Sequence, residues 1–192
     1  MMQKESDVIH GSSHGLGRRL FWAGTLIAAS VAFSLGFACA VPLAGFAAFA
    51  ALTTGRNEAL LLVLAVFLAN QCVGFGLLHY PQTTETFVWG AVLGVVALAA
   101  TLGAIWTRDH LHIGRFATIG AAFLVAFVVY EGLLFAATAI SGHGFEAYAM
   151  PVVARIFGIN AAAFVGLLAL HRLAAAVGVV DLTAVSRGSA LT

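Results

Sequence analysis

Long, almost uncharged apolar segments constrain this chain more than any other feature of its sequence. Between Leu20 and Arg172 the apolar runs are separated only by short polar turns. Hydrophobic residues make up 61% of the chain and charged residues only 9%, so one soluble core could not bury them all. Helices satisfy their own backbone hydrogen bonds and can therefore cross a lipid bilayer. The sequence predicts an all-α, polytopic membrane protein.

Breaks in the hydropathy pattern predict a six-helix transmembrane bundle with one short span. As a helix, the run from Leu20 to Ala40 is about 31 Å long, which is enough to cross the hydrocarbon core. Val41-Pro42 ends this run, and Leu43 to Thr53 is a short apolar piece that either crosses or is re-entrant. Caps and turn residues place the remaining spans at 57–79, 85–106, 114–140 and 151–172.

Positive charge sets the expected orientation of the spans. If the short piece crosses, all nine Lys and Arg except Arg155 lie on one side, as the positive-inside rule predicts for the cytoplasmic side. If it is re-entrant, Arg56 moves away from the side of Arg18-Arg19 and the asymmetry weakens. We therefore expect six crossings of a bacterial inner membrane with both termini cytoplasmic. The expected organisation is a tail, a transmembrane domain and a second tail at 1–19, 20–174 and 175–192.

Composition and motifs argue against several classes of function. The net charge is +1 and the basic residues are scattered, so no stripe suited to nucleic acid is present. Cys39 and Cys72 lie in apolar runs without the spacing of a zinc site. Nucleotide-binding and hydrolase motifs are missing, and the turn Arg108-Asp109-His110 is expected to be solvated. We expect no enzyme and no intrinsic cofactor; a haem or redox protein is the weaker alternative, because the deep polar layer contains no histidine.

Polar side chains at a common depth predict a binding site. Asn70, Gln71 and Cys72 lie roughly 12–15 Å inside the outer end of their span, and Glu131 and Asn160 lie at similar depths in theirs. Polar groups inside a membrane are costly, so a shared depth indicates a cavity open to the periplasmic side. The amides could instead form interhelical hydrogen bonds, and Glu131 and Cys72 could be purely structural.

Glu131 supports two hypotheses of function. An intramembrane carboxylate is a functional candidate, and its expected partners are Arg155 or Asn160. It could line a solute site, or it could carry a proton or cation in a coupled permease for a small solute or metal. His79 and Tyr80 flank the expected cavity in one of two outer loops that could form a lid.

One stretch carries a resemblance to a known family. The segment FLANQCVGFG from Phe67 to Gly76 is followed by Tyr80-Pro81. Together with the compact topology of six spans, one of them short, it resembles the substrate-binding membrane subunits, or S-components, of energy-coupling-factor vitamin transporters. Within that group it looks most like the BtuM-type cobalamin uptake proteins.

The resemblance implies a function and a partner. It implies a cavity that takes up a corrinoid from the periplasm, with a cysteine as an axial ligand of the cobalt. Cys72 is the position that would take this role, and Cys39 stays an alternative. A transmembrane coupling protein with two ATPases would dock at Ala28 and Ala32, whose spacing admits a close helix. The expected site consists of Cys72, Gln71, Asn70, Glu131, Asn160, Tyr80 and His79.

Overall fold

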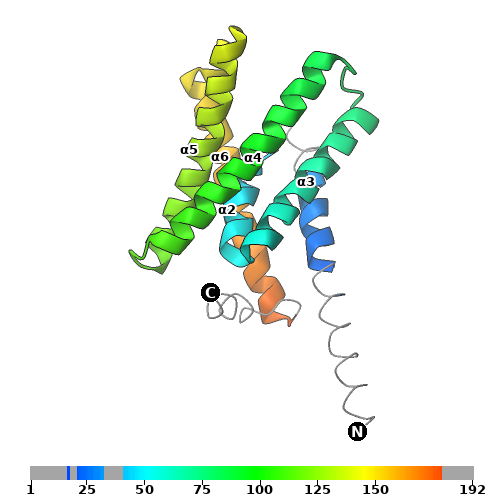
Figure 1. Cartoon of the computed structure of the whole chain (residues 1–192). Helices are drawn as coiled ribbons and strands as arrows, with labels where there is room; N and C mark the ends of the chain where they lie inside the picture. Colours follow the sequence, from blue (N-terminus) through cyan, green and yellow to red (C-terminus); the bar gives the residue numbers. More distant parts are fainter. Residues whose placement is uncertain (1–16, 18–20, 33–40, 179–192) are drawn as a thin grey trace.

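The computed structural model describes Gly17, residues 21–32 and residues 41–178 (Figure 1). Within these ranges every regular element is a helix and there is no strand. A helix at Phe21–Ala32 comes first. The following elements are α2 at Leu43–Thr53, α3 at Arg56–Gly76, α4 at Thr84–His110, α5 at Arg115–Ser141, the short 3-10 helix η1 at Phe145–Tyr148, and α6 at Met150–Ala176.

Four of these helices, α3 to α6, are long and apolar enough to cross a membrane. They bear many exposed large hydrophobic side chains, including Leu61, Val95 and Phe116, as expected for a surface in contact with lipid. The expected first span is described only over Phe21–Ala32, and α2 has 11 residues, about 16 Å. Four helices that are long and apolar enough to span a membrane are therefore present among the described residues, while the first predicted span lies partly outside them.

The helices alternate in direction, so their connections gather at two ends of the molecule (Figure 1). At the arginine end, α3 and α5 begin while α2, α4 and α6 finish; Arg56, Arg108, Arg115 and Arg172 lie there. The loop end holds the connection from α3 to α4 and the segment with η1. Among the described arginines only Arg155 lies towards the loop end, which matches the division of charge that the sequence predicts.

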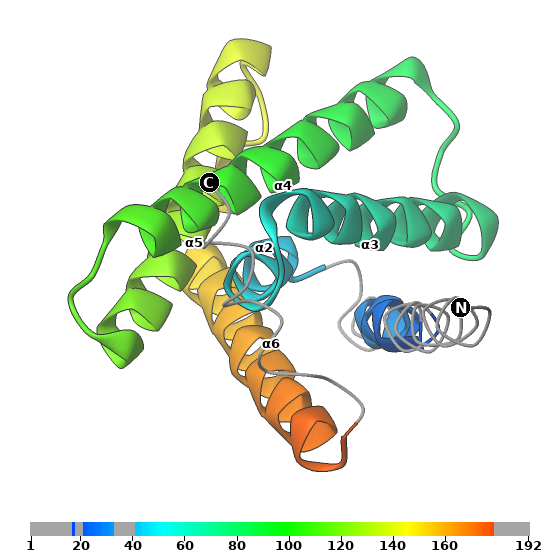
Figure 2. The same cartoon turned by 60° about the horizontal axis from the view of Figure 1, so that its bottom comes forward.

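Helix α2 lies at the centre of the bundle. It contacts α3, α4, α5 and α6, and every residue from Leu43 to Ala51 is buried (Figure 2). Small side chains make this close approach possible, because most of α2 is alanine or glycine. At Gly45 a Cβ atom would stand only 2.7 Å from the backbone oxygen of Asn160 on α6. The centre of the bundle therefore depends on a glycine at this crossing.

Other helices cap both ends of α2. Pro42 provides no side-chain cap, and the Asn160 side chain takes that place: its Oδ1 accepts a hydrogen bond of 3.0 Å from the Gly45 N–H. At the C-terminus, Arg108 donates to the carbonyls of Ala51 and Thr54. A cation suits this end because the helix dipole makes its free carbonyls partly negative. Two long-range contacts thus satisfy the backbone of a short, buried helix.

Two sequence predictions are corrected here. Arg108-Asp109-His110 belongs to the last turn of α4 and is not a loop. Asp109 and His110 are exposed, as expected, but Arg108 is half-buried, reaches the end of α2 and also bonds Asp109 at 2.7 Å. Helix α4 is also longer than expected: it begins at Thr84, with Thr83 as its N-cap accepting a bond of 3.3 Å from the Thr86 N–H. The remaining helix ends differ from the predicted ends by a few residues.

The helix Phe21–Ala32 attaches to the bundle by one face. Leu26 and Ser30 are buried, whereas Ala28 and Ala32 are exposed on the other face. The Asn70 side chain of α3 donates a hydrogen bond to the Ser30 hydroxyl. The two alanines predicted as a docking surface are therefore accessible in the described part of the chain.

Candidate functional site

A cavity of about 450 Å³ lies in the half of the bundle that α2 does not fill. Leu43, the first residue of α2, and Val41 just before that helix line the cavity on the side of α2. Tyr80, Ala147 and Tyr148 line it near the loop end. The volume falls within the range of roughly 300–1,000 Å³ that is usual for small-molecule sites. Exposed residues such as Arg155 and Ala147 belong to its wall, so a solute can reach it.

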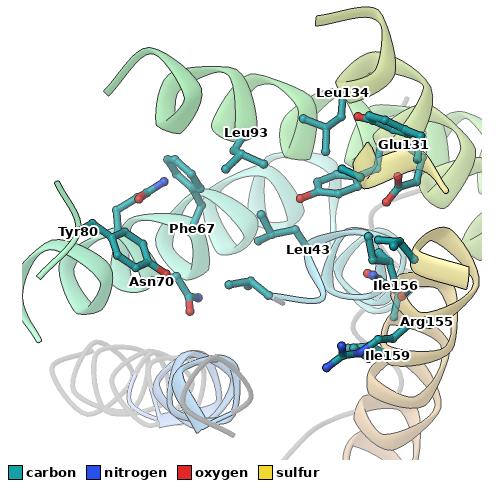
Figure 3. A pocket seen from close by; sticks show the side chains of 17 residues that line it. Leu43, Phe67, Asn70, Tyr80, Leu93, Glu131, Leu134, Arg155, Ile156 and Ile159 are labelled. Atoms are coloured by element: carbon teal, nitrogen blue, oxygen red, sulfur yellow. Dashed lines mark hydrogen bonds between the residues drawn. The ribbon is translucent and has the colours of Figure 1, made fainter. Parts of the chain in front are cut away.

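Residues of five α-helices, of the 3-10 helix η1 and of two connecting segments contribute to the wall (Figure 3). Most of the lining side chains are apolar, with a few polar groups among them, which is the usual composition of a solute site. The lining residues are Val41, Leu43, Phe67, Asn70, Gln71, Tyr80, Leu93, Tyr130, Glu131, Leu134, Ala147, Tyr148, Val152, Arg155, Ile156, Ile159 and Asn160.

Five of the seven predicted site residues meet at this cavity: Asn70, Gln71, Tyr80, Glu131 and Asn160. They come from α3, the loop after it, α5 and α6. The shared depth that was inferred from helical rise is therefore matched by a shared cavity. The expectation that this depth marks a hollow in the bundle agrees with the structure.

The amides differ in their roles. Asn160 caps α2, and its Nδ2 donates to the Ile156 carbonyl at 3.0 Å. Asn70 bonds Ser30 and the Val66 carbonyl, so it joins α3 to the helix Phe21–Ala32. These two side chains hold helices together, the alternative that sequence analysis left open. Gln71 makes no hydrogen bond within the described ranges and is free to meet a solute.

Glu131 has neither of the partners expected for it. Asn160 uses its side chain on Gly45 and Ile156, and no ion pair joins Glu131 to Arg155 among the residues that the structure describes. Both charged side chains nevertheless line the cavity. They lie on neighbouring helices at one side of it, with Tyr80 and Asn70 on the other side (Figure 3). Two opposite charges therefore face a hollow without neutralising one another in direct contact.

All three tyrosines of the chain line this cavity: Tyr80, Tyr130 and Tyr148. Tyr148 lies in η1, where burial raises the pKa of its hydroxyl and the negative charge of Glu131 raises it further, against a lowering by a hydrogen bond with Thr138. Tyr148 and Glu131 both line the cavity. Aromatic rings and a carboxylate thus share one wall.

The conformation of His79 explains how Tyr80 reaches the cavity. His79 has a φ of 53°, which turns the chain back towards α3, and the Tyr80 N–H bonds the Gly74 carbonyl at 3.1 Å. The Tyr80 ring then lies on Gly74, where a Cβ atom would collide with it. His79 itself is exposed and does not line the cavity.

The two cysteines are not placed in the cavity by the structure. Cys72 is exposed and is not part of the lining, although its neighbours Asn70 and Gln71 are. Successive residues of an α-helix point about 100° apart around its axis, so two residues at nearly the same depth can lie on different faces of the helix. Cys39 lies outside the described residues, two positions before the lining residue Val41 in the sequence.

Several lining residues had not been predicted. Tyr130 and Leu134 lie beside Glu131 on α5, and periodicity around that carboxylate could have identified them. Val41 and Leu43 could not have been identified in this way, because their role depends on where α2 begins in the bundle. Leu93 lies on α4, from which no site residue had been predicted.

The outer loops approach one another above α4 and α5. His143 Nε2 lies 3.5 Å from Glu85 Oε1, and both side chains are exposed. Phe135 packs edge-on against Tyr148 with ring centroids 5.0 Å apart, which anchors η1 beside the cavity. In the described ranges no group of three or more His, Cys, Asp or Glu could hold a metal ion.

Comparisons with known proteins add no family to this description. No protein-family model, no curated protein and no solved structure matches the chain.

Proposed function

We propose that this protein is a substrate-binding membrane transport protein that takes up a vitamin-sized solute. The observation that carries this proposal is the cavity of about 450 Å³ between the helices, with a mostly apolar lining in which Glu131, Arg155 and Gln71 have no hydrogen bond or ion pair among the described residues. The intramembrane charge of Glu131 adds support, because such groups usually mark a substrate or ion pathway. Binding in this cavity requires no covalent chemistry.

The membrane setting of the proposal follows from charge. The arginine end would face the cytoplasm of a bacterial inner membrane, in accord with the positive-inside rule. The loop end would face the periplasm, so the cavity would receive its solute from outside. Ala28 and Ala32 are exposed and would remain available to a coupling subunit with two ATPases.

Cobalamin or a related corrinoid is the specific solute to test, because the segment from Phe67 to Gly76 resembles the BtuM-type proteins. A corrinoid is larger than the cavity, so only part of it would be enclosed. Cys72 would have to reach the cobalt from outside the lining, whereas Cys39 precedes the lining residue Val41 by two positions in the sequence. Both thiols therefore belong in the experiment.

The experiment compares small molecules that co-purify with the full chain. Protein purified in detergent is extracted and analysed by mass spectrometry, and a second sample is incubated with cobalamin and its absorbance is recorded. The control is Ile156→Trp, which places an indole in the cavity. We expect a compound, or corrin absorbance, that the wild type retains and the control loses; Cys39→Ala and Cys72→Ala then test cobalt ligation.

A wild type that retains no compound and no corrin would overturn the proposal. A compound retained equally by Ile156→Trp would also contradict it, because the ligand would then lie elsewhere.

One observation favours a second candidate, a proton- or cation-coupled permease. Glu131 lines the cavity without an ion-pair partner among the described residues, so it is free to bind a proton or cation. Reconstituted vesicles distinguish the two. Solute accumulation that follows an imposed proton gradient and is lost in Glu131→Gln would favour the permease.

A further inference from the structure

The two charged residues that line the cavity, Glu131 and Arg155, lie on different helices. Glu131 lies ten residues before the end of α5 at Ser141, and Arg155 lies five residues after the start of α6 at Met150. Both side chains are part of the lining. Over the described part of the chain, neither has an ion pair or a hydrogen bond.

Unpaired charges of this kind are costly in a membrane protein, and direct pairing would be the usual way to lower that cost. Here a ligand can supply both counter-charges. A purely cationic solute would satisfy Glu131 and leave Arg155 unpaired, and a purely anionic solute would do the reverse. A solute that carries both charges can pair with Glu131 and with Arg155 at the same time, and it adds no net charge to the bundle.

The residues around Glu131 and Arg155 indicate which end of a ligand each of them would bind. Glu131 follows Tyr130 in the sequence, and both Tyr130 and Tyr148 line the same cavity as Glu131. Aromatic faces attract cationic nitrogen, most strongly where water is excluded. Arg155 offers a planar guanidinium that binds carboxylate or phosphate with two parallel hydrogen bonds.

We propose that this cavity selects a small zwitterion, with its cationic nitrogen at Glu131, Tyr130 and Tyr148 and its carboxylate or phosphate at Arg155. This inference rests on the proposed solute-binding function and narrows it to a class of substrate. The same pair of charges occurs in free solutes and in the headgroup of a zwitterionic lipid, so the test must separate these two sources.

The experiment measures thermal unfolding of the delipidated full-length protein with four soluble probes. Glycine betaine and phosphocholine carry both charges, choline carries only the cation, and 3,3-dimethylbutyrate carries only the anion. A ligand that binds only the folded state raises the unfolding temperature in proportion to its occupancy. We expect a rise of a few degrees with a zwitterion and a smaller rise with either single charge.

Two variants test the assignment of each end. Glu131→Gln should weaken zwitterion binding at least about tenfold and leave the anionic probe unaffected or improved. Arg155→Gln should weaken it to a similar degree and spare choline instead. This crossed pattern cannot arise from a general loss of structure. Arg172→Gln, a charge at the arginine end outside the cavity, is the matched control and should behave like the wild type.

A parallel measurement with lipids distinguishes a lipid headgroup from a free solute as the ligand. Phosphatidylethanolamine and phosphatidylglycerol are added separately to the delipidated protein. A shift with phosphatidylethanolamine alone, lost in both Gln variants, supports the zwitterion site and assigns it to a headgroup. A shift with soluble zwitterions supports it and assigns it to a free solute.

The inference and the proposed function fail in different ways. Equal zwitterion binding by the wild type and both Gln variants overturns the inference. A co-purified compound or corrinoid that binds in the cavity equally well without the charge of Glu131 or Arg155 also overturns it. In both cases solute binding itself stands. If no probe raises the unfolding temperature and no compound co-purifies, both the inference and the proposed function are overturned.

Discussion

The two halves of the bundle differ in how their polar side chains are bonded. In the half towards the arginine end, α2 fills the centre, and Asn160 and Arg108 satisfy the free backbone groups at its two ends. In the half towards the loop end α2 does not fill the centre, and among the described residues Glu131, Arg155 and Gln71 line a cavity without hydrogen bonds or ion pairs. The polar groups at the two ends of α2 hold helices together, whereas these three side chains do not; Asn70, which also lines the cavity, joins α3 to the helix Phe21–Ala32.

The contrast originates in the length of one helix. At 11 residues, α2 reaches about 16 Å, roughly half of a hydrocarbon core that is about 30 Å thick. Longer helices surround it, so they enclose more length than it can fill. The cavity lies beyond the start of this short helix, where Val41 and Leu43 line it.

The largest expected effect comes from closing the approach of α2 to α6. In Gly45→Ala the new Cβ would meet the Asn160 backbone oxygen at 2.7 Å, which a backbone cannot easily relieve. We expect a loss of roughly 3 kcal/mol in the free energy of unfolding, as in overpacked cores. Unfolding in detergent measures it.

The matched control is Gly158→Ala on α6, where a Cβ would meet nothing within 4 Å. Equal stability of the two variants would show that α2 is not tightly held at this crossing.

A somewhat smaller effect is expected at the other end of α2. Arg108→Gln removes the cation that bonds the carbonyls of Ala51 and Thr54. Hydrogen bonds from charged donors contribute roughly 2 kcal/mol, so the free energy of unfolding should fall by about that amount. Arg172→Gln, at an exposed position of the same end, should change little; a loss of similar size there would point to net charge rather than to the cap.

The third prediction compares two amides. Asn160→Ala removes the bond to Gly45 and should cost about 1 kcal/mol, a typical value for interhelical hydrogen bonds in membranes. Gln71→Ala removes no bond in the described structure and should leave the unfolding temperature unchanged while altering solute binding. If Gln71→Ala destabilised the protein as much as Asn160→Ala, the contrast between the two halves would not hold.

The smallest effect is expected where side chains already border empty space. Leu134→Ala enlarges the cavity and should lower the free energy of unfolding by less than about 1 kcal/mol, because few atoms pack against this side chain on the hollow side. Leu167, which is buried in the core cluster, is the comparison. Leu167→Ala should cost clearly more, and an equal cost would indicate that the cavity wall is as tightly packed as the core.

Helical rise explains why much of the site could be predicted. Depth along a helix follows directly from residue position, so Asn70, Gln71, Glu131 and Asn160 could be assigned to one layer before their neighbours were known. The direction of a side chain around the helix depends on which neighbours surround it. Cys72 illustrates this limit, since it shares the layer but is exposed.

The roles of polar residues were harder to predict than their depth. Asn160 and Glu131 are equally conspicuous in an apolar sequence, yet one caps a helix and the other remains unpaired in the described structure. Arg108 looked like part of a solvated turn because its distant partners, Ala51 and Thr54, lie in another helix. Contacts between helices that are far apart in sequence leave no local pattern.

Hydropathy and charge act through composition and local order, so the sequence alone predicted long apolar helices and an uneven distribution of arginine; four helices long enough to span a membrane are present among the described residues. Tertiary packing, by contrast, sets where α2 begins within the bundle, brings Asn160 and Arg108 to its two ends, and places Glu131 and Arg155 at one cavity with no ion pair between them among the described residues. The physical reason is that packing sets the rotation and height of each helix relative to its neighbours, and these two quantities decide which polar groups meet.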